Sequence, residues 1–211
     1  MPNYVHHTFE GGGIAIWHIT ETSDELYALL GMPCYDAQLL AKKNESRRAE
    51  WLAVRLLVKE LFGSECEVAY HPTGRPYLKN GTAHISISHT KGFAAVAYHH
   101  RAPLGMDIEY LSSRVERIAS RFTTRAEASY IDIHDKSARQ MYHLINWSAK
   151  ETLYKLFDSP SLAEFKEVFH IAPYTLGECG AMDATVFHAE KSVLAVSYRT
   201  FPEFVCTWAV L

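Results

Sequence analysis

The sequence predicts an α+β fold built from two similar halves. The predicted elements run strand, helices, strands and then repeat that order. The 211 residues are enough for two halves of about a hundred residues each. The order restarts near Ala102, so we expect an N-terminal half over residues 1–102 and a C-terminal half over residues 103–211. No low-complexity linker separates the halves, and they are expected to pack closely.

The first half begins with a β-rich segment over residues 14–19, preceded by three glycines. The glycines do not open a helix and no Gly-Lys-Ser/Thr follows, so they predict a flexible lead-in rather than a phosphate loop. A helix is predicted from Thr22 or Ser23, either of which suits the N-cap. The predicted helices span 22–30 and 37–62, and the strands that follow span 66–70, 84–88 and 93–98.

The second half is predicted to open with a strand over residues 104–110. Thr124 with Glu127 three residues later is a capping box, which predicts the start of a helix. Three helices are expected in a row, followed by strands to the end of the chain. The helices span 113–120, 124–131 and 137–157, and the strands span 165–171, 184–188, 193–198 and 204–210.

Composition excludes several classes of protein. A hydrophobic content of 48% is that of a globular chain. The net charge of −3 argues against a nucleic-acid partner. No apolar run approaches the roughly 20 residues of a membrane span, and the first residues lack the pattern of a secretory signal. The four cysteines are scattered, which indicates reduced thiols in a cytoplasmic protein.

Asp107 and Glu109 lie two residues apart on the predicted strand 104–110, so both side chains point to one face. Two neighbouring carboxylates repel each other unless a cation lies between them. Hard oxygen ligands favour Mg²⁺ or Mn²⁺. The alternative is an edge strand with two solvated acids, and the triplet alone does not decide between them.

Trp147, Glu151 and Lys155 fall on one face of the predicted helix 137–157. One interpretation is an exposed Glu151–Lys155 ion pair, which would stabilise the helix by about 0.3–0.5 kcal/mol. The other makes Glu151 a third metal ligand and Lys155 a phosphate contact. Lys150 lies about 100° from Glu151 around the helix and would flank this face.

Two segments of the first half have the chemistry of an anion site. Ser88, His89 and Thr90 present hydroxyls, an imidazole and loop amides near one strand end, which suits a phosphate. Arg75 lies between a glycine and a proline that would hold it on a rigid turn as a phosphate clamp. The plain interpretations are a hydrogen-bonded turn histidine and a solvated arginine.

Together these segments resemble the 4′-phosphopantetheinyl transferase superfamily, specifically its larger monomeric type, named for the surfactin-synthetase activator. That family carries Gly-Lys/Arg-Pro, Ser-His-Ser/Thr, Gly-x-Asp-x-Glu and Trp-x-x-Lys-Glu-x-x-x-Lys in this order. Arg75 stands for the commoner lysine and Thr90 for serine. The matching segments are residues 74–76, 88–90, 105–109 and 147–155, and residues 121–127 are similar to a further Arg-Phe stretch of the family.

The resemblance implies two similar α/β halves related by a pseudo-twofold, with the active site in the cleft between them. It implies transfer of the phosphopantetheine arm of coenzyme A to a serine of an apo acyl or peptidyl carrier protein, with release of adenosine 3′,5′-bisphosphate. It also implies Mg²⁺ as the cofactor, with Mn²⁺ as the alternative ion. A non-catalytic protein of the same fold that binds coenzyme A or a carrier remains the alternative.

The resemblance also assigns roles to residues. The implied metal ligands are Asp107, Glu109 and Glu151, and the implied catalytic residues are Glu151, Lys155 and Asp107. Arg47, Arg48 and Arg55 are all candidates for the arginines ahead of the first motif, and a spacing of seven favours Arg48 with Arg55. The implied coenzyme A contacts are Arg48, Arg55, Arg75, Ser88, His89, Lys150 and Lys155.

Carrier proteins are typically acidic, so we expect a local basic docking surface despite the net charge. Four arginines after the metal strand are plausible contacts, or else ordinary surface residues: Arg114, Arg117, Arg121 and Arg125. We expect a monomer with no nucleic-acid or membrane partner. Fatty acid, polyketide and peptide synthetases all fit as the source of the carrier.

Overall fold

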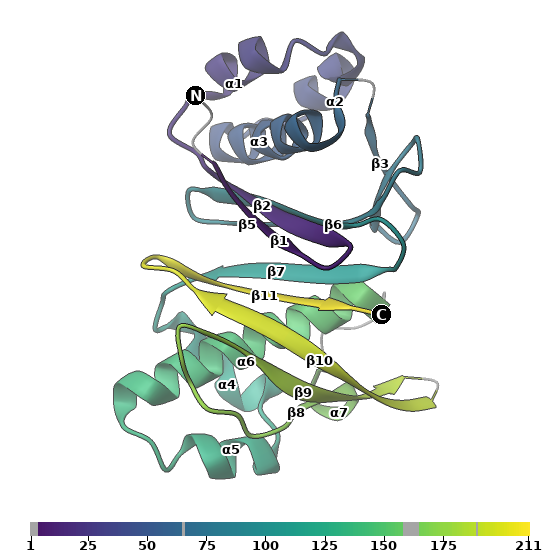
Figure 1. Ribbon diagram of the computed structural model, residues 1–211. Coiled ribbons are helices and arrows are strands. Elements are labelled where there is room, and N and C mark those ends of the chain that lie inside the picture. The colour runs from purple at the N-terminus through teal and green to yellow at the C-terminus, as the bar shows by residue number, and fades with distance from the viewer. Residues whose placement is uncertain (1–3, 65, 158–164, 189) are drawn as a thin grey trace. The chain divides into compact units, whose positions relative to one another are not determined.

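The computed structural model describes residues 4–64, 66–157, 165–188 and 190–211 (Figure 1). The chain divides into two compact units, Met1–Ala102 and Pro103–Leu211. Each unit has its own sheet, helices and apolar core. The predicted α+β class is therefore confirmed. No helix in the described part of the chain is both long and apolar enough to cross a membrane.

The first unit contains a four-stranded antiparallel sheet in the order β1-β2-β6-β5. Its strands are β1 (Tyr4–Phe9), β2 (Gly12–His18), β5 (His84–Thr90) and β6 (Phe93–His99). Its helices are α1 (Ser23–Leu30), the 3-10 turn η1 (Pro33–Tyr35), α2 (Asp36–Leu40) and α3 (Glu45–Phe62), and they lie on one face of the sheet (Figure 1). A separate two-stranded ribbon pairs β3 (Val68–Tyr70) with β4 (Pro76–Leu78).

The predicted helix over residues 37–62 is interrupted by residues 41–44. Helix α3 begins afresh after Asn44, whose backbone is extended and whose side chain accepts from Arg47 N at 3.1 Å. Asparagine competes with helix continuation in this way because its side chain satisfies a free amide of the new first turn. The prediction for the earlier helix is confirmed, since Thr22 and Glu25 form a capping box at the start of α1.

Gly12 and Gly13 belong to strand β2, so the prediction of a flexible lead-in was wrong. A Cβ added at Gly12 would overlap the Tyr98 carbonyl oxygen of the neighbouring strand β6. Glycine is required there because the two backbones approach closely. Strands β1 and β4 were not predicted, although β1 pairs with β2 along its whole length.

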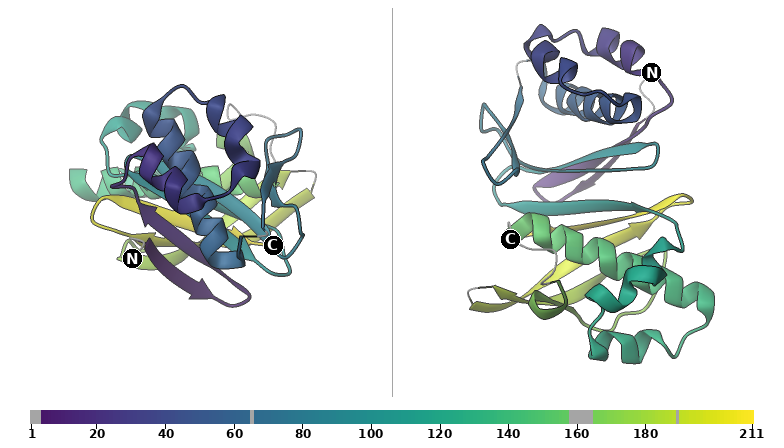
Figure 2. Two further views of the ribbon diagram at one scale, coloured as in Figure 1. Left: turned by 90° about the horizontal axis from the view of Figure 1, so that it is seen from above. Right: turned by 180° about the vertical axis from the view of Figure 1, so that it is seen from behind.

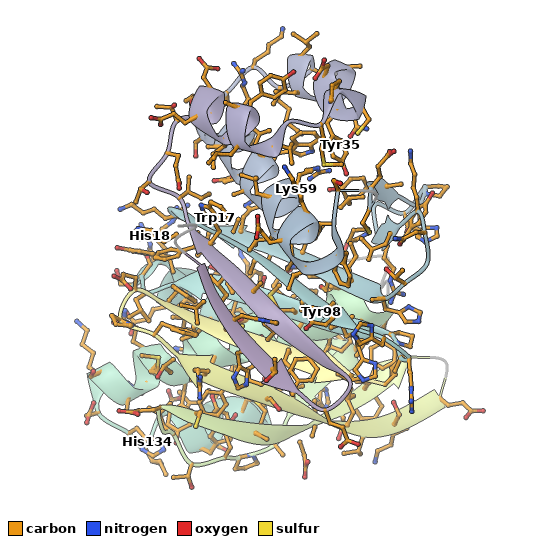
Figure 3. The ribbon with its side chains drawn as sticks, turned by 45° about the horizontal axis from the view of Figure 1, so that its top comes forward. Trp17, His18, Tyr35, Lys59, Tyr98 and His134 are labelled. Atoms are coloured by element: carbon orange, nitrogen blue, oxygen red, sulfur yellow. The ribbon has the colours of Figure 1, made fainter. Side chains whose placement is uncertain are left out.

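Side chains from the helical layer hold the first unit together (Figure 3). Lys59 of α3 donates to the carbonyl oxygen of Leu30 at 2.7 Å, which satisfies the end of α1. Tyr35 is buried, and its hydroxyl accepts from Val68 N at 2.8 Å. These bonds tie two helices and the small ribbon to one core, which also contains Trp17 of β2.

The second unit contains a five-stranded antiparallel sheet in the order β7-β11-β10-β9-β8. Its strands are β7 (Leu104–Tyr110), β8 (Phe169–Ile171), β9 (Cys179–His188), β10 (Glu190–Thr200) and β11 (Phe204–Val210). Its helices are α4 (Arg114–Phe122), α5 (Arg125–Ile131), α6 (Lys136–Phe157) and α7 (Phe165–Val168). Helix α6 packs on β7 and β11 (Figure 2).

The two units share a connectivity. In the first, β2 pairs with β6, which pairs with β5. In the second, β7 pairs with β11, which pairs with β10. A long helix follows the first strand of each set and packs against the sheet, α3 in one unit and α6 in the other. The order of elements read from the sequence therefore corresponds to a repeated arrangement of strands.

The predicted strand over residues 165–171 is a strand only in its last three residues. The first four form helix α7, and only Phe169–Ile171 pair with β9. Phe165 is buried and packs against Phe169. An apolar run of this length does not distinguish a buried helical turn from a strand.

Candidate active site

Gly105 sets how closely helix α6 approaches strand β7. A Cβ added there would overlap the Thr152 carbonyl oxygen and lie 3.0 Å from Leu156 Cβ, both on α6. Only glycine permits this approach. Asp107 and Glu109 follow at alternate positions and face the same helix. The glycine of the Gly-x-Asp-x-Glu segment thus brings both carboxylates against α6.

Asp107 is the buried centre of the site, with 4% of its surface exposed. Its Oδ1 accepts from Lys155 Nζ at 2.8 Å and its Oδ2 accepts from Ser148 Oγ at 2.9 Å. The Lys155 ammonium also donates to the Met106 carbonyl oxygen at 3.1 Å. Both carboxylate oxygens are held by donors from α6, so the helix sets the direction of this side chain.

Glu109 is held by the indole of Trp147, whose Nε1 donates to Glu109 Oε1 at 2.9 Å. The indole ring packs between Phe122 and Phe165, with centroid distances of 5.1 and 5.5 Å. Burial and then the negative charge of Asp107 raise the pKa of Glu109 to about 7. Trp147 therefore packs in the core and also orients an acid of the site.

Glu151 lies one helical turn after Trp147 and one turn before Lys155. Burial and then the charge of Asp107 raise its pKa to about 7, an effect that Lys155 opposes. The charge of Glu109 adds a smaller increase. The structure thus brings the three predicted acids into one electrostatic neighbourhood, from a strand and a helix that are distant in sequence.

The three carboxylates fit a hard divalent cation by their chemistry. Their oxygens are the ligands that Mg²⁺ and Mn²⁺ prefer. Burial and then the charge of Asp107 raise the pKa values of Glu109 and Glu151, and a cation would relieve the repulsion between these acids. Among the residues that the structure describes, no three acidic, histidine or cysteine side chains form a ready-made metal cage. Lys155 supplies the positive charge beside Asp107 in this arrangement.

Lys150 does not flank the site, and its predicted role as a coenzyme A contact is not supported. Its ammonium is fully buried and donates to Phe122 O at 2.6 Å and Glu127 Oε2 at 2.9 Å. Glu127 also accepts from the backbone amides of Thr124 and Ile171. Lys150 precedes Glu151 by one residue on the helix, so its side chain points in a different direction, into the core. A buried ammonium there needs a paired carboxylate.

Arg55 is also buried, with 2% of its surface exposed, so the structure does not support its predicted role as a phosphate contact. Its guanidinium lies 3.8 Å from the centroid of the Trp51 ring and donates to the Tyr70 hydroxyl at 3.1 Å. Because Arg48 and Arg55 share a helix face, both were predicted to contact coenzyme A. Among the described residues, aromatic side chains cover Arg55 but not Arg48.

Arg48 remains partly exposed on α3, at 3.6 Å from the highly exposed carboxylate of Asp24. Its Nε is buried and has no hydrogen-bond partner within the described ranges. A buried N–H without an acceptor is unusual in a folded protein. The chemistry of this group fits an anion.

The other predicted contacts of the first unit lie at strand ends. Ser88 is buried on β5, and the adjacent His89 is half exposed with its Nδ1 at 3.5 Å from Glu50 Oε2. These two groups form an ion pair only when His89 is protonated. Arg75 lies in the turn between β3 and β4, where Gly74 has a φ of 91°. The turn depends on glycine, because that backbone conformation strains other residues.

Sequence reasoning missed the hydroxyl groups beneath Asp107. Ser148, Thr152 and Thr207 are all fully buried and linked to one another. The spacing of four between Ser148 and Thr152 was a signal that both share a helix face. Thr207 lies on β11, 55 residues after Thr152, and nothing local indicated its place in the site.

Comparison with known families agrees with this geometry. Residues 103–207 match the family model of the 4′-phosphopantetheinyl transferase superfamily. The match spans nearly all of the second unit, including β7, α6 and the three acids. It supports assignment of the chain to this superfamily. No curated protein gives a significant match to the chain.

Proposed function

We propose that this protein transfers the 4′-phosphopantetheine arm of coenzyme A to a serine of an apo acyl or peptidyl carrier protein. The other product is adenosine 3′,5′-bisphosphate. The observation that carries the proposal is the cluster of Asp107, Glu109 and Glu151 with Lys155, lying within the segment that matches the superfamily. Three neighbouring carboxylates that together bind a cation, with a lysine beside them, suit the binding of a charged diphosphate.

In this proposal Asp107, Glu109 and Glu151 hold Mg²⁺, which when bound neutralises the diphosphate and favours the charge that develops during transfer. Glu151 is the proposed acceptor of the carrier serine proton, directly or through water, because it is the acid of the cluster carried by helix α6. Lys155 moves from its ion pair with Asp107 to a phosphate oxygen of the leaving group.

The first unit supplies phosphate contacts. Arg48 is the strongest candidate for a coenzyme A phosphate, because its Nε has no acceptor among the described residues and its side chain is partly exposed, whereas Arg55, whose Nε also lacks an acceptor, is buried. Arg75 on its glycine-dependent turn and His89 beside Glu50 are further candidates. Arg55 and Lys150 are not among the proposed contacts, because Arg55 is buried against aromatic rings and Lys150 in an ion pair.

Helix α4 is proposed as part of the docking surface for an acidic carrier. Arg114, Arg117 and Arg121 are exposed and lie on one side of this helix. Arg125, also exposed, follows at the start of α5. Opposite charges would steer the two proteins together and set their register.

The proposal is tested by incubating the protein with coenzyme A, Mg²⁺ and apo carrier proteins from fatty acid, polyketide and peptide synthesis. Transfer of the phosphopantetheine arm adds about 340 Da to the carrier. Intact-mass spectrometry of the carrier detects it. Coenzyme A binding without any gain of mass would instead identify a non-catalytic binding protein of this fold.

Glu151→Gln is the informative variant. It removes one metal ligand and the proposed base but keeps the size of the side chain, so we expect transfer to be abolished in a folded protein. Glu178→Gln, at an exposed position before β9, is the matched control and should transfer normally. Near-normal turnover by Glu151→Gln would refute the role given to this residue.

A further inference from the structure

Three buried hydroxyl groups form a continuous chain that ends on Asp107. Ser148 Oγ lies 2.9 Å from Asp107 Oδ2 and 2.9 Å from Thr207 Oγ1. Thr207 Oγ1 in turn lies 2.7 Å from Thr152 Oγ1. All three hydroxyl residues have no exposed surface, and the chain joins helix α6 to strand β11, which pairs with β7 beside it in the sheet, Thr207 opposite Asp107.

The direction of this chain follows from counting protons. Each hydroxyl has one proton, and the Asp107 carboxylate in its ion pair with Lys155 only accepts. Ser148 must therefore donate to Asp107. Thr207 must then donate to Ser148, and Thr152 must donate to Thr207 Oγ1. The Thr152 proton is shared with the Thr207 carbonyl oxygen at 3.1 Å, as in a three-centre hydrogen bond.

The O–H dipoles of Ser148 and Thr207 thus point toward Asp107, while that of Thr152 is divided between Thr207 Oγ1 and the Thr207 carbonyl oxygen. Hydrogen bonds aligned in a chain polarise and strengthen one another, most of all where water is excluded. Ser148 on its own would be free to rotate its proton toward another acceptor. With Thr207 donating to it from behind, the Ser148 proton has one direction left.

We propose that the Ser148–Thr207–Thr152 chain is a positioning device that fixes the Asp107 carboxylate for metal binding. Ser148 donates to Oδ2 and Lys155 to Oδ1, so the hydroxyl chain holds the carboxylate by its Oδ2 and sets the direction of its Oδ1. Groups that orient a ligand in this way commonly alter metal affinity when removed. The inference rests on the proposed function for its metal, but its test does not require transfer.

The test measures Mn²⁺ binding by the full-length protein without carrier, using the electron paramagnetic resonance signal of the free ion, with and without coenzyme A. Ser148→Ala removes the direct donor, and we expect the Kd for Mn²⁺ to rise about 10-fold or more. Thr207→Val is isosteric and leaves Ser148 in place but undirected, so a smaller rise is expected. Thr207→Ser keeps the hydroxyl and should restore binding close to that of the wild type.

A matched control separates positioning from general loss of stability. Thr123 is buried in the same unit, and its Oγ1 has no hydrogen-bond partner among the described residues. Thr123→Val should leave the Kd for Mn²⁺ unchanged. Thermal unfolding of the metal-free proteins shows whether each variant is folded at the temperature of the binding experiment.

Wild-type Mn²⁺ affinity in both Ser148→Ala and Thr207→Val would overturn the inference, as would failure of Thr207→Ser to restore binding. Failure of the proposed function gives a different result. In that case the wild type binds Mn²⁺ and the variants bind it weakly, but no carrier gains mass. Carrier modification without dependence on a divalent cation would overturn the positioning role and leave transfer itself standing.

Discussion

Lys150 Nζ and Glu127 Oε2 form an ion pair at 2.9 Å, and the two side chains are buried, with 0% and 1% of their surface exposed. Glu127 also caps helix α5 and accepts from Ile171 N of strand β8. The pair therefore connects α5, α6 and the sheet of the second unit. It fixes the part of α6 that carries Glu151, the residue next to Lys150.

Lys150→Met is expected to destabilise the second unit by about 3–5 kcal/mol, because it leaves the Glu127 carboxylate buried and unpaired. Urea unfolding with a metal-free sample measures the loss. The double variant Lys150→Met with Glu127→Leu removes both charges and should recover part of it. Wild-type stability in the single variant would show that the pair contributes nothing.

Stability in the absence of divalent cations should fall as the pH rises from about 4.5 to about 7. Glu109 and Glu151 have folded-state pKa values raised to about 7, so the folded protein keeps protons that the unfolded chain has released. Urea unfolding in a chelator, at several pH values between 4 and 8 in the range set by these groups, measures the slope.

Glu109→Gln and Glu151→Gln should each flatten this pH dependence, since each removes one of the two groups responsible. The exposed Glu178→Gln should keep the wild-type slope. Added Mg²⁺ should stabilise the wild type more at pH 8 than at pH 5, because the cation binds the deprotonated carboxylates. A pH dependence that neither glutamine variant changes would contradict the assignment; His143, whose pKa is lowered by burial, contributes a slope of the opposite sign in all of these proteins.

Gly105→Ala should destabilise the protein by about 1–3 kcal/mol and weaken Mn²⁺ binding. The added methyl overlaps the Thr152 carbonyl oxygen, so helix and strand must move apart. Gly177→Ala is the matched control, because its Cβ would meet its nearest neighbour at an ordinary 3.5 Å. Chemical unfolding and the Mn²⁺ titration measure the two effects, and equal results for both variants would refute the packing argument.

Arg48 and Arg55 are expected to differ in role, Arg48 in binding coenzyme A and Arg55 in stabilising the first unit. Arg48→Ala is expected to raise the Kd for coenzyme A about 10-fold, the loss of one charge-assisted contact, with little change in stability. Arg55→Ala should instead destabilise the first unit by about 2–4 kcal/mol, because its guanidinium fills a space between aromatic rings. Calorimetric titration and urea unfolding distinguish them, and exchanged outcomes would contradict the structure.

Arg117→Glu on α4 should raise the KM for an acidic carrier protein severalfold and leave the KM for coenzyme A unchanged. Reversal of an exposed charge weakens electrostatic steering, and the difference from the wild type should shrink in high salt. Lys191→Glu, on the β9–β10 hairpin, changes the net charge equally and is the control. Equal effects of the two variants would exclude a local docking surface at α4.

Periodicity and end signals predicted most elements well. Strands β7 and β11 have the predicted bounds, and both capping boxes at Thr22 and Thr124 start helices. The errors occurred where contacts with distant residues decide the local structure. Gly12 is held in a strand by β6, and the segment from Phe165 is a helical turn because only its end pairs with β9.

By itself the sequence determined which face of an element each acid occupies, because alternation and helical spacing are properties of a single segment. Asp107 with Glu109, and Glu151 with Lys155, could be paired in this way. Only the tertiary structure decided that strand and helix meet at Gly105, that Lys150 turns into the core, and that Thr207 completes a hydroxyl chain. These relationships join residues far apart in the chain, and the packing of helix α6 against the sheet creates them.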